Sequence, residues 1–195
     1  MKIKLNSFLL EIENLLIIVL ISFFFSDTIK LFLTSYFVCY LFIIFHELSH
    51  IIFASLFGKK INKIKLSLAG VCVIFNNNDD LKLVEKLIMY IAGPIANICL
   101  AIAFYNIDFV FEINIFLAIL NLVPVYPLDG YNILKCVQDL IHINVLKNVE
   151  YTFLSLLFFI SIYILFYSYN PSLFIFFIYI MLIKYVTKNQ VKSRK

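Results

Sequence analysis

The chain has 195 residues, of which 63% are hydrophobic and 14% charged, with a net charge of +4 and a mean hydropathy of +0.99. Soluble globular domains do not carry this much apolar surface, so the composition excludes that class. It predicts an all-α polytopic membrane protein. At ~20 residues per span, the length is sufficient for about six transmembrane helices and short loops. We therefore expect one membrane domain over residues 1–195 and no separate soluble domain.

Basic residues are distributed asymmetrically around six apolar segments. If the N-terminus is cytoplasmic, only Lys30 of the 16 lysines and arginines lies outside, which is the positive-inside distribution. We expect a multi-pass protein of the cell membrane with both termini in the cytoplasm. Its basic C-terminal tail should contact anionic lipid of the bilayer, not nucleic acid. The predicted spans are Leu15–Phe25, Leu31–Phe57, Leu87–Phe104, Phe109–Val123, Tyr151–Tyr167 and Leu173–Tyr185.

The first predicted span, Leu15–Phe25, has a short apolar run that also fits the core of a signal peptide. No small-x-small cleavage pattern follows Phe25. This absence favours a transmembrane span over a cleaved signal.

The second predicted span, Leu31–Phe57, contains the pattern His46-Glu47-x-x-His50. Each polar or charged group inside hydrocarbon costs on the order of 2.5–3.5 kcal/mol, so three of them in five residues indicate a function. Histidines at positions i and i+4 share one helix face and can bind one zinc ion through neutral imidazole nitrogens. Glu47 lies beside such a metal, where it can accept a proton from a zinc-bound water. The alternative is a buried polar cluster or the transport path of a channel.

Residues Ile61–Phe75 break the helical pattern. Polar residues at positions 63, 65 and 67 alternate with apolar ones, which is the periodicity of a strand. Ala69-Gly70 can form a turn before a second strand. We expect a short membrane-associated β-hairpin after the second span, with an irregular amphipathic loop as the alternative.

The third and fourth predicted spans each place an asparagine beside residues that disrupt helices. Gly93-Pro94 allows close helix contact and frees a backbone carbonyl, and Asn97 follows one turn deeper. Asn97 either caps freed backbone groups or helps to shape a polar cavity. The fourth span ends after Asn121, where Pro124 and Pro127 stop or distort the helix near the cytoplasmic side.

Asp129 follows these prolines and taken alone fits an ordinary Asp-Gly turn or helix cap. A catalytic zinc, however, needs three protein ligands and an open position, and the histidine pair supplies only two. His142 and Asp129 are the candidates for the third ligand. Asp129 is favoured because it lies at the same cytoplasmic depth as the histidines. Its charge also helps to balance Zn²⁺. With two neutral histidines and the carboxylates of Asp129 and Glu47, the net charge of the site is zero.

Three motifs together resemble the site-2 protease family of intramembrane zinc metalloproteases. They are His46-Glu47-x-x-His50, Gly93-Pro94-x-x-Asn97 and the run from Asn121 to Gly130, with its two prolines and Leu128-Asp129-Gly130. The resemblance is strongest over residues 31–131. The hairpin segment and the six-span layout look like the sporulation branch of that family, the stage IV sporulation protein FB type.

The resemblance implies one Zn²⁺ per chain, held by His46, His50 and Asp129, with Glu47 as the catalytic base. It implies that Asn97 and Asn121 line or support the cleft. The hairpin, with Gly70 at its turn, would help to present the substrate.

By the same resemblance, the chain would cleave a membrane-associated precursor in regulated intramembrane proteolysis, and a sporulation sigma-factor precursor is the specific candidate. Inhibitory membrane proteins and self-association are the further partners it implies. We expect the chain to differ from many relatives in lacking a peptide-binding or nucleotide-sensing domain, for which the 195 residues leave no room.

Three alternatives remain on the sequence alone. The chain could be a general site-2-type protease that acts on another membrane-anchored regulator. A metal-binding membrane transporter is the alternative from another class, although it would spread polar residues along several spans. A catalytically inactive scaffold is disfavoured by the intact Glu47.

Overall fold

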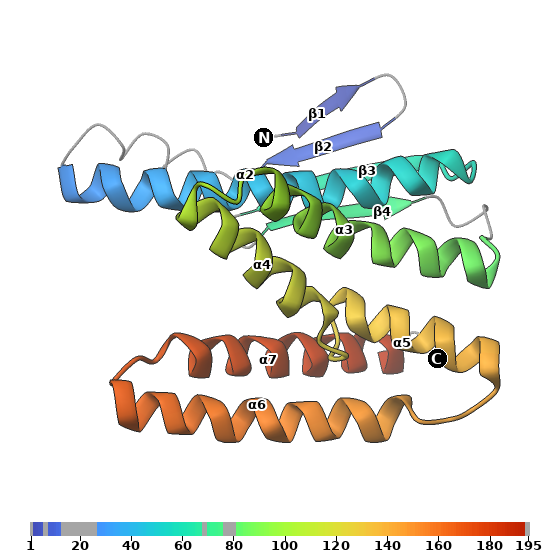
Figure 1. Ribbon diagram of the computed structural model, residues 1–195. Coiled ribbons are helices and arrows are strands. Elements are labelled where there is room, and N and C mark those ends of the chain that lie inside the picture. The colour runs from blue at the N-terminus through green and yellow to red at the C-terminus, as the bar shows by residue number, and fades with distance from the viewer. Residues whose placement is uncertain (1, 6–7, 13–26, 68–69, 76–80, 194–195) are drawn as a thin grey trace. The chain divides into compact units, whose positions relative to one another are not determined.

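The structure is a computed structural model that describes residues 2–5, 8–12, 27–67, 70–75 and 81–193. Within these residues the chain forms six helices and four strands, shown with their labels in Figure 1. It divides into two compact units, Met1–Ile119 and Leu120–Lys195. The expectation of a single membrane domain stays a prediction.

The first unit is built on two packed helices, α2 (Asp27–Leu56) and α3 (Leu83–Ala103). Ala54 of α2 and Met89 of α3 are buried against each other together with Leu81. Small residues in the middle of α3, Ala92 and Gly93, are buried too, and such residues let two helix backbones approach closely. The helix α4 (Asp108–Leu122) follows α3 and continues into the second unit.

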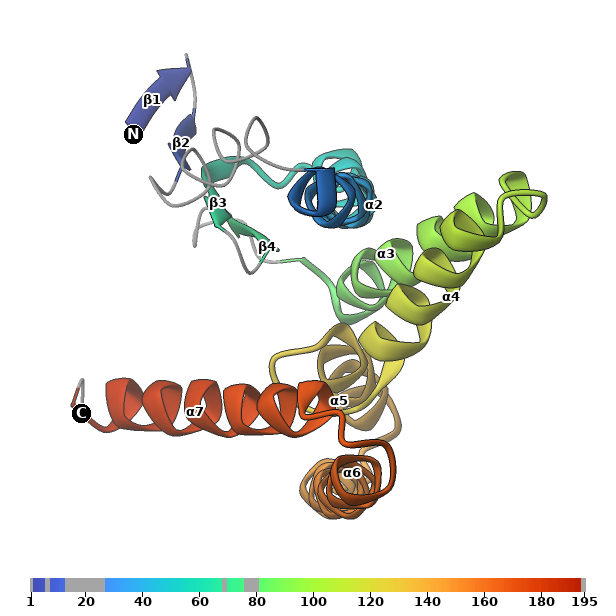
Figure 2. The same cartoon turned by 90° about the vertical axis from the view of Figure 1, so that its left-hand side faces the viewer.

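A four-stranded sheet completes the first unit. Its strands are β1 (Lys2–Leu5), β2 (Phe8–Ile12), β3 (Ile61–Ser67) and β4 (Gly70–Phe75), and they lie in that order. Strands β3 and β4 pair in antiparallel fashion in the segment where the sequence predicts two strands, with a register shift between Ile61 and Lys63. The turn residues 68–69 lie outside the described part of the chain. Figure 2 shows α2 with the sheet on one flank and α3 on another.

The N-terminal strands are the part of the sheet that the sequence analysis did not foresee. β2 pairs in parallel with β3 and antiparallel with β1. An isolated two-stranded hairpin is marginally stable, and these two strands enlarge it to a sheet of four. Whether the sheet lies against a membrane stays a prediction.

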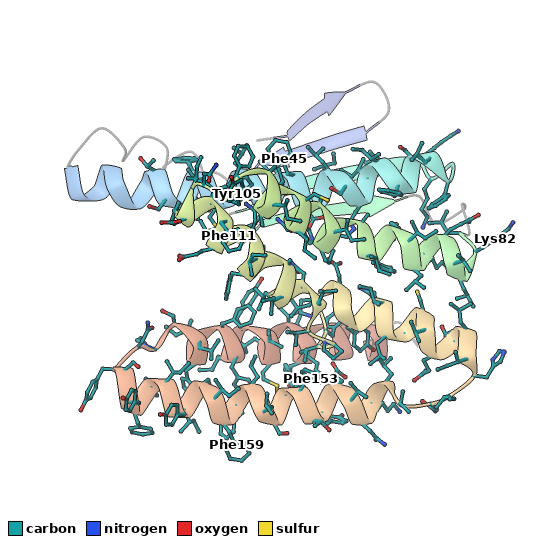
Figure 3. The ribbon with its side chains drawn as sticks, viewed as in Figure 1. Phe45, Lys82, Tyr105, Phe111, Phe153 and Phe159 are labelled. Atoms are coloured by element: carbon teal, nitrogen blue, oxygen red, sulfur yellow. The ribbon has the colours of Figure 1, made fainter. Side chains whose placement is uncertain are left out.

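The second unit contains α5 (Asp129–Ile141), α6 (Leu146–Ser168) and α7 (Ser172–Ser193). Val125, Leu154 and Ile180 form its buried apolar cluster. In Figure 2 α6 is seen end-on while α7 runs across the picture, so these two helices cross at their contact. Phe159 of α6 projects away from α7 and is 67% exposed, as expected of a side chain that faces lipid (Figure 3).

Three helices are long and apolar enough to cross a membrane: Thr34–Leu56, Leu83–Ala103 and Leu146–Ser168. They correspond to the second, third and fifth predicted spans. The helix α4 has 15 residues, or about 22 Å, against about 30 Å of hydrocarbon, and the apolar part of α7, Ser172–Val186, is similarly short. The first predicted span lies outside the described residues. A membrane-spanning protein is therefore supported, whereas the number of six spans stays a prediction.

An ion pair inside the second unit ties α7 to the chain before α5. The ammonium of Lys184 lies 2.9 Å from Oε1 of Glu150, which is 6% exposed, and the main-chain N–H of Tyr126 donates to the same oxygen at 3.3 Å. Lys184 also lies over the ring of Tyr151, at 4.7 Å from its centroid. The pair therefore joins α6, α7 and the loop that leads to Asp129.

We expect Glu150→Leu to lower stability by about 2–3 kcal/mol, because the substitution leaves the Lys184 charge in an apolar site. This is below the cost for fully buried pairs, since the Lys184 side chain is 27% exposed. Thermal unfolding in detergent checks the effect. The double variant Glu150→Leu/Lys184→Met should recover most of the loss, and equal instability of the single and double variants would contradict the explanation.

Candidate metal centre

Two buried histidines of α2 face each other. His46 and His50 are one helical turn apart and 4% and 8% exposed. Their ring centroids are 4.8 Å apart and their planes nearly perpendicular, at 84°. The two Nε2 atoms approach to 3.1 Å. The pair that the sequence places on one helix face therefore directs the same nitrogen of each ring toward one point.

The other nitrogen of His50 contacts the backbone of α3. Its Nδ1 lies 2.7 Å from the main-chain oxygen of Met89. A carbonyl oxygen only accepts hydrogen bonds, so Nδ1 of the neutral ring carries the hydrogen and Nε2 carries the lone pair. This is the tautomer that a metal needs at Nε2.

The other nitrogen of His46 is held by side chains. Nδ1 lies 2.5 Å from Oδ1 of Asn97 on α3, and Nδ2 of Asn97 donates to Oδ1 of Asn114 on α4 at 3.0 Å. Nδ2 of Asn114 then donates to the main-chain oxygen of Val110 at 2.9 Å. Asn97 and Asn114 are both fully buried. Asn97 thus contacts the predicted metal ligand directly, and its place beside the cleft stays a prediction.

Asn114 is a site residue that the sequence analysis missed. It lies in the middle of the apolar stretch of α4, where a polar side chain is expensive. The cost of a polar side chain in an apolar helix was the feature of the sequence that could have identified Asn114. The identity of its partners depends on packing between α3 and α4 and could not be read from the residues nearby.

The histidine pair fits a divalent metal. With both Nδ1 atoms protonated, neither Nε2 has a hydrogen to give the other, so a shared cation is what stabilises two lone pairs 3.1 Å apart. Zinc–nitrogen bonds of about 2.0–2.1 Å at a tetrahedral angle would separate the nitrogens by about 3.3 Å. The observed spacing is close to that value.

Gly93 provides the room for the two rings. A Cβ atom at this position of α3 would lie within 2.6 Å of both imidazoles, closer than real Cβ contacts allow. The glycine that the sequence analysis read as permitting close helix contact is therefore required by the histidines themselves.

We expect Gly93→Ala to weaken zinc binding at least about 10-fold, because the methyl group displaces both imidazoles from their shared point. Competition with a chelator measures this. Ala92→Gly, at the neighbouring buried position, is the control for altered helix propensity and should retain affinity. Normal affinity in Gly93→Ala would show that the rings do not need this space.

Glu47 follows His46 on α2 and is half-buried. One residue further along a helix of 3.6 residues per turn turns the side chain by about 100°. Glu47 therefore does not share the face of the two histidines, and its predicted role as the catalytic base stays a prediction.

Asp129 belongs to the second unit, where it is the first residue of α5 and half-buried. A carboxylate in the first turn is favoured by the helix dipole. A Cβ at the next residue, Gly130, would lie 2.5 Å from the main-chain oxygen of Val123, so the glycine allows α5 to start close to the end of α4. The predicted approach of Asp129 to the histidines stays a prediction.

His142, the other candidate for a third ligand, is exposed at the opposite end of α5 from Asp129. The helix between them has 13 residues, which corresponds to about 20 Å. At most one of the two residues can therefore complete the same metal site. Asn121 is half-buried at the end of α4, and its role stays a prediction, as does that of Gly70 at the start of β4.

Tyr131 lies two residues after Asp129, and the fold raises the pKa of its side chain. Burial, and to a smaller extent the charges of Glu150 and Tyr126, raise the pKa of its phenol above the usual value of 10.0. Tyr131 therefore stays protonated and uncharged at neutral pH.

The fold has a counterpart among solved structures. It is similar to the Site-2 Protease from Methanocaldococcus jannaschii, with a TM-score of 0.61 and 21% sequence identity over 92% of this chain and 91% of that chain. No protein-family model and no curated protein matches the sequence. At this level of identity the likeness shows that the two chains share a fold.

Proposed function

We propose that the protein is an intramembrane zinc metalloprotease. The observation that carries this proposal is the pair of buried imidazoles on an apolar, membrane-length helix, with both Nε2 atoms directed at one point. The likeness in fold to a Site-2 Protease supports it. Neutral imidazole is a common zinc ligand, and polar groups kept at this depth are expensive unless they are used.

Asp129 is the third ligand in this proposal. Two histidines and one carboxylate are a donor set of catalytic zinc sites, which keep a fourth position open. The carboxylate brings one negative charge to a site of low dielectric, where Zn²⁺ and two neutral rings alone would leave two positive charges.

Glu47 is the proposed acid and base of peptide hydrolysis. Zinc, when bound, lowers the pKa of its water toward about 7 and polarises a carbonyl group. The Glu47 carboxylate accepts the proton that the attacking water loses, holds it on a carboxyl oxygen, and returns it to the nitrogen of the leaving amine. Asn97 keeps the His46 ring in place through the contact at Nδ1. The scissile bond must be extended, because a helix hides its carbonyl groups.

The sheet offers an edge for such an extended segment. β3 is paired on both sides, by β2 and β4, so it cannot take a further strand. β4 lies at the end of the described sheet and contacts α2, the helix that carries the histidines. We infer that a substrate segment adds as a strand to β4, beginning near Gly70.

The substrate we propose is a membrane-associated precursor of a transcription regulator. A sporulation sigma-factor precursor is the specific candidate, and another membrane-anchored regulator is the alternative. The topology we propose has both termini in the cytoplasm, so the released product would be cytoplasmic. Inhibitory membrane proteins and self-association remain proposals of the same kind.

Co-expression tests the function. The chain and its Glu47→Gln variant are each expressed with candidate tagged precursors, and a shortened product is sought by immunoblotting. A product that requires Glu47 and disappears on chelation supports the protease. Metal-dependent solute uptake into vesicles, with no product from any precursor, would instead indicate a transporter.

A further inference from the structure

The hydrogen bonds that link Val110, Asn114, Asn97 and His46 all have a defined donor and acceptor, and the main-chain carbonyl of Val110 fixes the first of them. Val110 presents an oxygen that only accepts, so the group of Asn114 that faces it at 2.9 Å must be the NH₂. The oxygen of the same amide then faces Asn97. One fixed acceptor in the backbone of α4 thereby determines which way the Asn114 amide points.

The same direction passes through Asn97 to the ring. Because Asn114 presents its oxygen, Asn97 must donate with Nδ2 at 3.0 Å and present its own oxygen to Nδ1 of His46. The neutral ring therefore carries its hydrogen on Nδ1 and its lone pair on Nε2. A reversed Asn97 amide would place two acceptor oxygens face to face at Asn114 and an NH₂ donor at Nδ1 of His46.

Burial fixes the direction of these hydrogen bonds. Asn97 and Asn114 are fully buried and His46 is 4% exposed, so water does not compete for these groups. Buried donors and acceptors that are left unpaired lose their hydration without compensation, which disfavours the reversed arrangement.

The two histidines obtain the same tautomer by different means. His50 contacts the backbone oxygen of Met89, which cannot turn around. His46 contacts a side-chain amide, whose two ends are nearly equal in shape and can exchange by rotation. The Asn97 amide alone does not select a tautomer, so a second group must decide its orientation.

We propose that Asn114 is a positioning residue that sets the tautomer of His46 through Asn97, and so prepares Nε2 for the metal. This inference rests on the proposed metal site. Supporting residues around metal ligands commonly contribute 10–100-fold to metal affinity, and about that effect is expected here.

The direct test reads the tautomer in metal-free protein. The chain has three histidines, so histidine labelled with ¹⁵N in its ring gives few signals in membranes, and His46 is the one lost in His46→Gln. The chemical shifts of its two ring nitrogens report which of them carries the hydrogen. The wild type should show it on Nδ1, and Asn114→Leu should shift a substantial fraction to Nε2. An unchanged tautomer in Asn114→Leu overturns the proposal.

A double-mutant cycle separates this role from a merely structural one. Asn97→Asp places an acceptor toward His46 whichever way the side chain turns. Asn114→Leu should weaken zinc binding about 10–100-fold in the wild type and less than about 3-fold when Asn97 is already Asp. An equal loss in both backgrounds would mean that Asn114 acts through packing, and would overturn the proposal.

Two further variants keep the test decisive. Asn114→Ala replaces the leucine variant if that protein is not recovered. Asn114→Asp should retain affinity, because the oxygen that faces the Val110 carbonyl can carry a proton and donate it there while the other oxygen accepts from Asn97. Since the tautomer is read without metal or substrate, failure of the protease proposal in a cleavage assay is distinguishable from failure of this one.

Discussion

Replacing Glu47 by glutamine is expected to lower the rate of precursor cleavage by about 10²–10⁴-fold while the protein keeps its zinc. Glutamine has nearly the same shape, but its amide cannot take up and return a proton at neutral pH. Glu47 lies outside the face of α2 that His46 and His50 share, so the metal ligands should be undisturbed. Product formation by purified protein, together with zinc content per chain, measures both parts of this expectation.

A matched control comes from the first unit of the chain. Glu112 on α4 is a second glutamate of the first unit and has no part in the proposed chemistry, so Glu112→Gln should cleave normally. Cleavage by Glu47→Gln at the wild-type rate would remove Glu47 as the acid and base, and with it the mechanism.

Replacing Asp129 by alanine should lower zinc affinity strongly, because a ligand and a negative charge are both lost. The loss should exceed the contribution of a residue that only supports a ligand, which is about 10–100-fold. Asp129→Asn separates the two, because it keeps an oxygen and removes the charge. Zinc content after dialysis, and chelator competition where zinc is retained, provide the measurement.

Two variants on the same helix control for this effect. Asp139→Ala makes the identical substitution at an exposed position of α5 and should leave zinc unchanged. His142→Gln tests the other candidate ligand at the far end of that helix. Full zinc in Asp129→Ala with loss in His142→Gln would transfer the third ligand to His142.

The elements that follow from short-range periodicity were predictable. The alternation of residues 63, 65 and 67 corresponds to β3, and the apolar runs near α2, α3 and α6 correspond to the helices of membrane length. By contrast, β1 and β2 were not foreseen, because β2 pairs with β3, some fifty residues further along the chain, and β1 joins the sheet only through β2. The bounds of α4, Asp108–Leu122, agree within one residue with the predicted span Phe109–Val123, because the prolines that follow mark the end of the helix.

The sequence by itself determined that two imidazoles share one face of an apolar helix with a carboxylate beside them, because positions i and i+4 of a helix coincide whatever surrounds them. Only the tertiary structure decided which nitrogen of each ring is turned to the metal. That choice comes from Met89 and Asn97 on α3, and from Asn114 and Val110 on α4. Hydrogen-bond partners from distant segments are brought together by packing, and no local pattern of residues specifies them.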